Sequence, residues 1–374
     1  MQHEKFMLQA LKIAKLGKGY VEPNPMVGAV IVRDDKIIAA GYHVRYGQLH
    51  AERNAIADAA RRQVDIAGAD MYVTLEPCSH FGKTPPCTDA ILKAKIARVF
   101  VAMEDPDEKV AGRGIEILKQ AGVEVQVGIC EEQAKKMLAS YIKNRTKKRP
   151  WVICKWAQTS DGYLALGKGA DRWISCETSR KQVHEIRSYC DGILAGIGTV
   201  LADNPMLNNR LGKGRQPVRI VLDSQLRIPI HCKLVESARD YKLLVVTSFH
   251  SLNDRTEIAQ ALEKSGAEVL PVSTVAGKLN LTELLVELGK QGFTNLLVEG
   301  GAQVLKSFIS KNLADELVVF QSPVSLKSAG GNLKETLPRF DISTAVDMIN
   351  PEEFYSPEVT ESGCDKLTRI IRKI

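Results

Sequence analysis

The feature that most constrains the fold is an alternation of strand-like and helix-like segments that starts near the N-terminus and starts again after residue 150. In the first half, apolar runs at 26–32 and 36–42 predict a hairpin, and alanines recur at helical spacing through 50–63. Further strands are expected at 71–75 and 98–103, each followed by a helical segment. This alternation predicts an α/β domain in which helices cover a sheet.

The second half repeats the pattern from WVICKWA onward. Its strand-like runs lie at 191–196, 218–223, 242–248, 267–272, 294–301 and 316–322. Helical segments such as 281–292 lie between them, and 365–374 alternates like a final edge strand. The basic run KNRTKKRP at 143–150 separates the halves and is more typical of a solvated linker than of a binding site. We therefore predict two α/β domains, residues 1–145 and 150–374.

Composition limits the kinds of ligand that the chain can be expected to bind and the compartment in which it is expected. A net charge of +7 is compatible with nucleic acid, but equally with phosphorylated small molecules and a phosphorylated cofactor. The eight cysteines are scattered, unlike the disulfide framework of a short secreted domain. The amphipathic N-terminus lacks the apolar core of a signal peptide, and no apolar run approaches the ~18 residues of a membrane helix. We expect a cytoplasmic protein without a membrane partner.

A zinc site is predicted by two short motifs in the first domain. His50 and Glu52 form an H-x-E motif at the start of a predicted helix, and Cys78 follows a proline. Together with Cys87, the histidine and the first cysteine supply three metal ligands and leave a fourth position for water. Zinc lowers the pKa of that water to about 7, and Glu52 is placed to move protons. This is the zinc-deaminase signature, except that eight residues separate the two cysteines.

The same residues allow a second interpretation, a structural zinc site with His80 as the fourth protein ligand. We favour the catalytic interpretation, because a structural site leaves Glu52 without a role. It also leaves unexplained Asn24 in PNPMVG, which could hydrogen-bond a ring bound in the site.

The second domain contains no G-x-G-x-x-G fingerprint. Two features still suggest ligands. LLVEGGAQVL at 296–305 is a strand that ends in Glu-Gly-Gly and opens a helix, which suits a phosphate at a helix N-terminus. A polar loop after the strand at 191–196 carries Thr199, Asp203 and Arg210. Taken alone, each feature is more typical of ordinary turns than of a binding site.

The first domain resembles a known family. The ordered motifs PNPMVGAVIV, GYHVRYGQLHAE, TLEPCSHFGKTPPC and DPDEKVAGRGIEILKQAGVEV are similar to the deaminase domain of the bifunctional riboflavin biosynthesis proteins. The resemblance implies a cytidine-deaminase-like α/β/α layer domain. It also implies zinc-dependent hydrolytic deamination of 2,5-diamino-6-(5-phosphoribosylamino)pyrimidin-4(3H)-one, with Glu52 as the catalytic residue. The long segment between the cysteines would be a substrate-binding loop, and Asn24, His80 and Lys83 would contact the substrate.

The second domain resembles the reductase domain of the same family in KWAQTSDGYLAL, 171–210, VRIVLDSQLRIP and LLVEGG. The resemblance implies a dihydrofolate-reductase-like α/β fold and an NADPH-dependent reduction that opens the ribose of 5-amino-6-(5-phosphoribosylamino)uracil to a ribityl chain. The residues it places at NADPH are Ala157, Trp173, Thr199, Asp203, Gly300, Gly301, Ala302, Gln303, Val304 and Leu305. The residues it places at the substrate are Asp171, Arg187, Leu207, Arg210 and Glu299. The two arginines would hold the 5-phosphate.

Two other functions remain open on the residues alone. A zinc-dependent nucleic-acid base deaminase with a basic accessory domain explains H-x-E, P-C and the positive charge. It does not explain the Glu-Gly-Gly turn, and aromatic residues for base stacking make up only 6% of the chain. A binding module with structural zinc and an RNA-contacting linker is the third possibility. We favour the two-step enzyme, with Zn2+ and NADPH, a phosphorylated pyrimidine substrate and no nucleic-acid partner, and we expect a homo-oligomer (dimer or tetramer).

Overall fold

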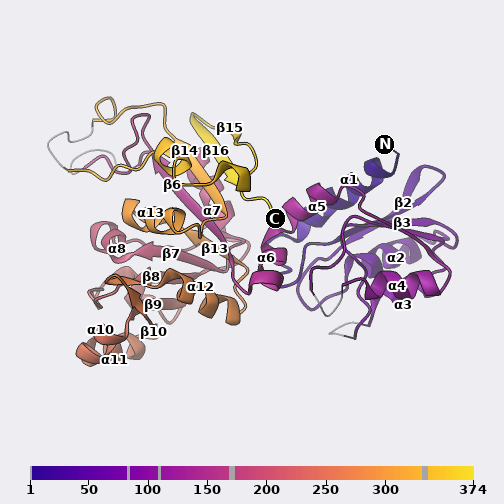
Figure 1. Cartoon of the computed structure of the whole chain (residues 1–374), viewed down its shortest axis with the longest axis horizontal. Coiled ribbons are helices and arrows are strands. Elements are labelled where there is room, and N and C mark those ends of the chain that lie inside the picture. The colour runs from indigo at the N-terminus through magenta and orange to yellow at the C-terminus, as the bar shows by residue number, and fades with distance from the viewer. Residues whose placement is uncertain (1, 82–84, 108–110, 168–172, 331–335) are drawn as a thin grey trace. The chain divides into compact units, whose positions relative to one another are not determined.

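The computed structural model describes residues 2–81, 85–107, 111–167, 173–330 and 336–374. The chain divides into two compact units, Met1–Lys148 and Arg149–Lys373, and each is built on its own sheet (Figure 1). In the part of the chain that is described, no helix has the length and apolar character needed to cross a bilayer.

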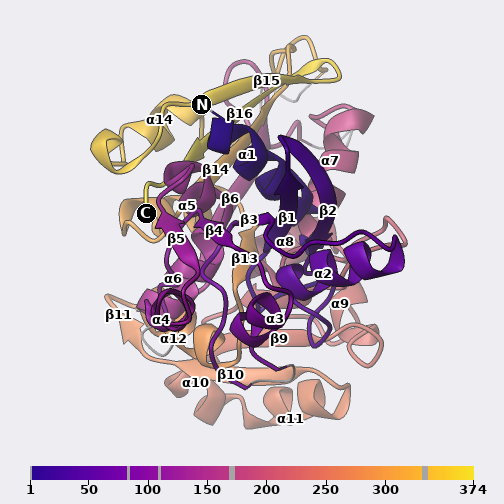
Figure 2. The ribbon, with the colours of Figure 1, turned by 90° about the vertical axis from the view of Figure 1, so that its right-hand side faces the viewer.

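The first unit has a five-stranded sheet in the order β2-β1-β3-β4-β5, and Figure 2 shows the strands following one another in that order. The strands are β1 (Gly28–Arg33), β2 (Lys36–Tyr42), β3 (Asp70–Val73), β4 (Arg98–Val101) and β5 (Glu124–Val127). β1 runs antiparallel to β2 and β3, whereas β3, β4 and β5 are parallel. The predicted hairpin is confirmed. Its turn consists of Asp34 and Asp35, both at positive φ as a type I′ turn requires.

Helices cover both faces of this sheet. They are α1 (Gln2–Ala14), α2 (Ala51–Arg61), α3 (Cys87–Lys93), α4 (Arg113–Gln120), α5 (Glu131–Met137) and α6 (Ala139–Lys147), with a 3₁₀ turn at Lys15–Gly17. Alternate residues of β1 separate the two cores. Val30 packs with α1, α5 and α6, and Ile31 packs with α2, α3 and α4. The α/β/α layers expected from the sequence are therefore confirmed, and Figure 1 shows α1 and α5 opposite α2 and α3.

The second unit has a nine-stranded sheet in the order β10-β9-β8-β7-β13-β6-β14-β16-β15. The strands are β6 (Trp151–Gln158), β7 (Gly192–Gly196), β8 (Val218–Leu222), β9 (Leu243–Ser248), β10 (Glu268–Val272), β13 (Asn295–Val298), β14 (Glu316–Gln321), β15 (Glu358–Ser362) and β16 (Asp365–Ile371). The neighbours from β10 to β14 in this order are parallel, and the β15–β16 hairpin is antiparallel. A small two-stranded sheet pairs β11 (Thr274–Val275) with β12 (Lys278–Leu279).

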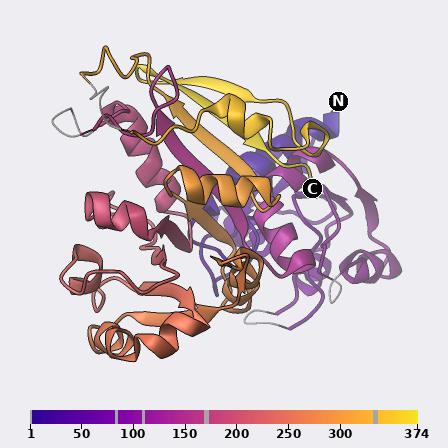
Figure 3. The same ribbon diagram turned by 60° about the vertical axis from the view of Figure 1, so that its left-hand side comes forward.

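The parallel strands β6, β7, β9, β13 and β14 are largely buried on both faces, as their apolar sequences require, whereas only Val272 of β10 is buried. The helices of this unit are α7 (Glu177–Arg187), α8 (Ile197–Asp203), α9 (Lys233–Glu236), α10 (Phe249–Asp254), α11 (Thr256–Lys264), α12 (Leu281–Lys290), α13 (Ala302–Ser310) and α14 (Ile342–Val346), with a 3₁₀ turn at Pro351–Glu353. Leu285 of α12 and Phe308 of α13 join the main apolar core over one face, where Figure 3 shows α13 in orange crossing the strands.

The expectation that 365–374 forms an edge strand is wrong. β16 pairs with β14 on one side and with β15 on the other, so β15 forms the edge. Four of the five residues of β15 are exposed. The sequence EVTES therefore gave no apolar signal for this strand. Figure 3 shows the hairpin in yellow at one end of the sheet.

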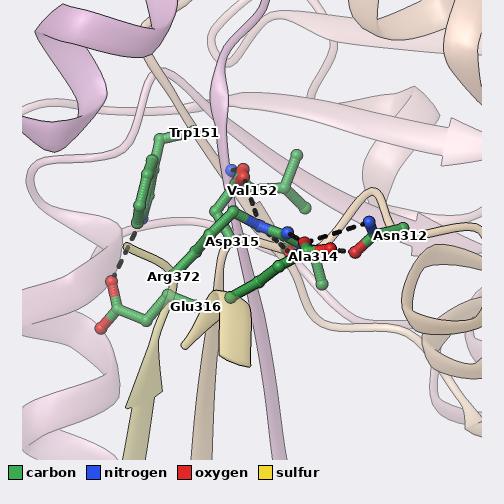
Figure 4. Close-up of polar contacts among 8 residues, drawn as sticks. Trp151, Val152, Asn312, Ala314, Asp315, Glu316 and Arg372 are labelled. Atoms are coloured by element: carbon green, nitrogen blue, oxygen red, sulfur yellow. Dashed lines mark hydrogen bonds and ion pairs between the residues drawn. The ribbon is translucent and has the colours of Figure 1, made fainter. Parts of the chain in front are cut away.

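A polar cluster joins the beginnings of β6 and β14 to the end of β16 (Figure 4). The Asp315 carboxylate, 4% exposed, accepts a hydrogen bond of 2.7 Å from the Val152 N–H and lies 3.5 Å from the Arg372 guanidinium. Arg372 also donates to the Ala314 carbonyl at 2.9 Å and pairs with Glu353. The buried acid therefore satisfies both a backbone donor and a cation, and its loss would leave the Val152 N–H unpaired and remove one of the partners of Arg372.

We expect Asp315→Ala to lower the free energy of unfolding of the second unit by about 2 kcal/mol, because it leaves the buried Val152 N–H without a partner and removes one of the partners of Arg372. All three tryptophans, Trp151, Trp156 and Trp173, lie in this unit, so tryptophan fluorescence in urea measures the change. Glu287→Gln, which removes an exposed pair with Lys290, is the control and should change stability by less than about 0.5 kcal/mol. Equal effects of the two substitutions would contradict the prediction.

Candidate active sites

In the first unit, three metal-binding side chains come from two helix N-termini and the segment after β3. His50 is the N-cap of α2, Cys87 is the first residue of α3, and Cys78 lies beyond the end of β3. The Cys87 N–H donates to the Cys78 carbonyl at 3.0 Å and to its sulfur at 3.4 Å, so the backbone draws the two cysteines together.

The separations of the donor atoms fit a tetrahedral metal ion. His50 Nδ1 lies 3.4 Å from Cys78 Sγ and 3.5 Å from Cys87 Sγ, and all three donors lie within 4.8 Å of one another. Zinc with bonds of about 2.3 Å to sulfur and 2.0–2.1 Å to nitrogen sets such neighbours about 3.5 Å apart. His80, the fourth ligand of the structural alternative, does not belong to this group of donors. The set therefore has the three-ligand composition of a catalytic zinc site.

Burial and proximity change the ionisation of this group. Hydrogen bonding to Cys87 lowers the pKa of Cys78 to about 4, whereas hydrogen bonding to Cys78, followed by burial, raises the pKa of Cys87. The donor set thus places a thiolate in a largely buried site, which favours binding of a cation. Glu52 is only 3% exposed. Its burial, and to a smaller extent the nearby charge of Cys78, raises the pKa of its carboxyl group to about 7. A carboxyl group with that pKa can both accept and donate a proton near neutral pH.

A cavity of about 210 Å³ opens over these residues. Its lining includes Glu52, Asn24 and His80, three of the residues expected at the catalytic centre and its substrate. Asn24 Nδ2 lies 3.3 Å from His43 Nε2, and His43 Nδ1 lies 3.0 Å from the Leu49 carbonyl. Lys83, which was expected to contact the substrate, lies outside the described residues.

A second polar group on the wall of this cavity was not predicted from the sequence. Tyr141 of α6 donates to the Asp105 carboxylate at 3.0 and 3.1 Å, and the Asp105 N–H donates to buried Glu76 at 3.2 Å. Glu76 also accepts from the Gly112 and Gly114 N–H groups at 2.9 and 2.8 Å, which fixes the start of α4. The available signal was the position of Asp105 just beyond β4, at the carboxyl end of a parallel strand.

In the second unit, the expected ligand residues gather at the carboxyl ends of the adjacent parallel strands β7, β13 and β6. Glu299 follows β13, and its N–H donates to Leu194 of β7 at 2.9 Å. Its carboxylate receives two hydrogen bonds from Arg187, at 2.8 and 2.7 Å, and both side chains are 12% exposed. Arg187 also donates to the Asn208 carbonyl at 3.0 Å. This crevice is where open α/β sheets bind ligands.

The Glu-Gly-Gly turn brings the chain close to other predicted cofactor residues. A Cβ atom on Gly300 would lie 2.6 Å from Val304, and one on Gly301 would lie 3.9 Å from the Thr199 hydroxyl. The absence of side chains at this turn therefore leaves the N-terminus of α13 open beside α8. A phosphorylated cofactor fits such a backbone surface.

The remaining expected residues differ in their surroundings. Leu305 packs in the apolar core and Leu207 is buried, whereas Gln303, Asp203 and Arg210 are exposed. Ala157 and Ala302 are half-buried, in β6 and at the start of α13. Trp173 is 49% exposed, with the Arg180 guanidinium 5.0 Å from its ring centre. Asp171 lies outside the described residues.

Two ionisable residues beside Glu299 were not predicted. Lys155 lies on β6, where its neighbour Cys154 is paired with Val298, and burial lowers its pKa although Glu299 opposes the shift. Burial, followed by the charges of Arg187 and Arg210, lowers the pKa of His184 to about 4. The available signal was a lysine inside the apolar run WVICKWA. Basic side chains therefore concentrate around one glutamate, and the lowered pKa keeps His184 neutral near pH 7.

A second cavity of about 530 Å³ lies at the carboxyl ends of β8, β9 and β10. Its polar lining includes Ser224, Ser248, Ser251, Arg255 and Ser273. Hydroxyl groups and an arginine at this edge of a parallel sheet are suited to a phosphorylated nucleotide.

Comparison with known proteins identifies the family. Residues 1–103 match the model of the cytidine and deoxycytidylate deaminase zinc-binding region, and residues 150–337 match that of the RibD C-terminal domain. Riboflavin biosynthesis protein RibD of Bacillus amyloliquefaciens is 37% identical over 369 residues, which are 98% of this chain and 96% of the relative. The RibD protein of Escherichia coli K12 is 34% identical over 385 residues, which cover 99% of this chain and 100% of the relative. The chain belongs to the RibD family.

Solved structures agree over the whole length. Acinetobacter baumannii RibD matches with a TM-score of 0.81 and 33% identity, covering 100% of this chain and 99% of that one. A diaminohydroxyphosphoribosylaminopyrimidine deaminase/5-amino-6-(5-phosphoribosylamino)uracil reductase of Thermotoga maritima also matches. Its TM-score is 0.80, its sequence identity is 35%, and the match covers 99% of each chain. The predicted fold class, a deaminase-type domain followed by a reductase domain, is confirmed, and the chain is a bifunctional deaminase and reductase of riboflavin biosynthesis.

The Arg187–Glu299 pair predicts a pH dependence of stability. Burial alone would raise the pKa of Glu299, but the Arg187 charge and hydrogen bonds outweigh it and lower the pKa to about 2. A lowered pKa in the folded state contributes about 3 kcal/mol to the free energy of unfolding. This contribution is fully present above the unfolded-state pKa of about 4.3 and is lost as the pH falls toward 2. We therefore expect Glu299→Gln to be most destabilising at pH 7 and progressively less so below pH about 4.5.

Urea unfolding followed by tryptophan fluorescence from pH 7 to pH 3 measures this difference. Glu263→Gln, at an exposed position of α11, is the matched control and should show no such trend. A constant difference between wild type and Glu299→Gln across this range would contradict the assigned pairing.

Proposed function

We propose that this chain carries out two consecutive reactions on one phosphorylated pyrimidine. The first is hydrolytic deamination of 2,5-diamino-6-(5-phosphoribosylamino)pyrimidin-4(3H)-one. The second is NADPH-dependent reduction of the ribose of the product, 5-amino-6-(5-phosphoribosylamino)uracil, to a ribityl chain. The observation that carries the first step is the group His50, Cys78 and Cys87, which lies beside buried Glu52 at one small cavity.

In the deamination, His50, Cys78 and Cys87 would hold zinc, which when bound acidifies a water molecule and so supplies the nucleophile. Glu52 would accept the proton of that water and pass it to the ring nitrogen. It would then take the remaining proton of the added hydroxyl group and give it to the departing amine, so that water and the amino group become a carbonyl and ammonia. Asn24 on the cavity wall would hydrogen-bond the edge of the pyrimidine.

In the reduction, the turn at Gly300 and Gly301 and the nearby Thr199 would bind NADPH, which supplies the reducing equivalent when bound. The 530 Å³ cavity at β8, β9 and β10 would accommodate its phosphorylated nucleoside. Arg187 is already engaged by Glu299 and the Asn208 carbonyl, so the exposed Arg210 is the arginine most open to the substrate phosphate. Lys155 would face the opening sugar, where it can supply a proton, and Glu299 would remain an ionised partner of Arg187 beside it.

We expect Cys87→Ser to reduce the zinc content of the purified protein from about one per chain to well below that, because a thiolate ligand is lost from a three-ligand site. Metal analysis by mass spectrometry after gel filtration gives the content. Cys130→Ser, at a half-buried cysteine outside the site, should retain zinc as the wild type does. Equal zinc retention by both variants would contradict the ligand assignment.

We expect Glu52→Gln to slow ammonia release by roughly 10²–10⁴-fold while zinc is retained, since a proton carrier rather than a ligand is removed. Ammonia and NADPH are followed together with the diaminopyrimidine ribotide as substrate. NADPH oxidation should also stop, and it should return to the wild-type rate when the deaminated uracil ribotide is supplied instead.

Arg210→Ala is the reciprocal variant and should slow only the NADPH step. Ammonia release without any NADPH consumption by the wild type would overturn the reductase assignment. If the zinc-loaded wild type neither releases ammonia nor oxidises NADPH, the proposal as a whole is overturned.

A further inference from the structure

Two cysteines that are distant in the sequence meet at the outer hairpin of the second unit. Cys176 is the N-cap of α7, and Cys364 lies in the turn between β15 and β16. Their sulfur atoms and a carboxylate oxygen of Asp365 lie within 4.8 Å of one another. Neither cysteine takes part in the proposed reactions.

The turn brings its own backbone onto the Cys176 thiol. Ser362 pairs with Asp365, so the hairpin has a two-residue turn, and its first residue, Gly363, has φ +63° as a type II′ turn requires. A Cβ atom on Gly363 would lie 2.8 Å from Cys176 Sγ. Glycine is therefore needed here both for the turn and for the close approach, and the next residue is Cys364.

Hydrogen bonds that do not use the thiols hold the two segments together. The Cys176 N–H donates to Asp365 Oδ2 at 2.9 Å. The Ser179 hydroxyl lies 2.8 Å from that of Ser362 and donates to the Ser362 carbonyl at 3.1 Å, and the Ser362 hydroxyl donates to Gln182 at 3.1 Å. The approach of the two sulfur atoms is therefore set before any bond forms between them.

The two thiols differ in ways that suit exchange chemistry. Cys364 is exposed and Cys176 is half-buried. Burial alone would raise the pKa of Cys176, but hydrogen bonds with Ser179 and Cys364 outweigh it and lower that pKa, and a helix N-terminus also favours a thiolate. An exposed thiol can meet a reagent, and a neighbouring thiol that ionises readily can then displace it.

We propose that Cys176 and Cys364 form an intrachain disulfide by exchange with a low-molecular-weight disulfide such as glutathione disulfide. In the first step, the Cys364 sulfur bonds to one sulfur of the reagent, the reagent's S–S bond breaks, and the departing thiol takes the Cys364 proton. In the second step, the Cys176 sulfur bonds to the Cys364 sulfur and expels the second thiol, which takes the Cys176 proton. The two cysteines lose two electrons, and the reagent gains them.

A bound metal ion is the competing use of the same atoms. Only three candidate donors meet among the described residues here, and Asp365 Oδ2 already accepts the Cys176 N–H. A structural zinc site is almost always four-coordinate. The disulfide needs only the two sulfur atoms, which already lie within 4.8 Å of each other and would close to about 2.05 Å. The bond would fasten the beginning of α7, the helix that ends at Arg187, to the edge hairpin.

The test uses full-length, zinc-loaded protein equilibrated in mixtures of reduced and oxidised glutathione at pH 7.5. Free thiols are then trapped with N-ethylmaleimide, and unreduced digests are examined by mass spectrometry. We expect a peptide pair joined through Cys176 and Cys364, lighter by two hydrogens than the separate peptides. The linked pair should form in glutathione mixtures in which the ratio of reduced to oxidised Cys130 is at least tenfold higher than the same ratio for Cys176 and Cys364.

Cys364→Ser, an exposed turn substitution, should abolish the linked pair and leave the fold and zinc content unchanged, whereas Cys130→Ser should not affect the linkage. Glutathione that remains on Cys364 without linkage, or oxidation of all cysteines alike, would overturn the proposal. A second zinc per chain that Cys176→Ser removes would show a metal site instead. The outcome does not depend on the proposed reactions, because the readout is the bond itself.

Discussion

Both sites depend on one constraint, the cost of holding ionisable side chains away from water at the carboxyl ends of parallel strands. Several of the buried groups therefore have close partners. The Arg187 guanidinium neutralises Glu299, and backbone N–H groups after β4 surround Glu76. The Cys78 thiolate lies beside the His50 imidazole. These pairings fix the positions of the loops that carry the remaining site residues, so the chemistry and the local stability have the same origin.

The sequence predicted the parts of the fold that short segments determine. The hairpin of β1 and β2 has its own turn residues, and His50 precedes a helix with regular alanines, so both were recognisable locally. The three zinc-ligand candidates were found because each residue type has a restricted chemistry. Their convergence could be expected because helix N-termini and strand ends meet at the same edge of a layered α/β domain.

The parts that depend on contacts distant in the sequence could not be predicted. β15 has few buried residues and is defined by pairing with β16, so its own residues carry no clear pattern. Tyr141 of α6 reaches Asp105, which lies in the loop after β4, 36 residues away in the chain. Resemblance to the family suggested Arg187 as a phosphate ligand. Only the three-dimensional contacts reveal its two hydrogen bonds to Glu299, which lies 112 residues away.

The strand order of the second unit has a consequence for synthesis on the ribosome. β6 is the first strand of that unit to be made, yet its two neighbours are β13 and β14, which end at Val298 and Gln321. The centre of the sheet therefore cannot assemble until most of the chain has emerged. The strands of the first unit pair within about the first 130 residues, so its sheet can assemble early. β6 stays unpaired until β13 and β14 have been made, and its exposed apolar side chains can bind chaperones during that time.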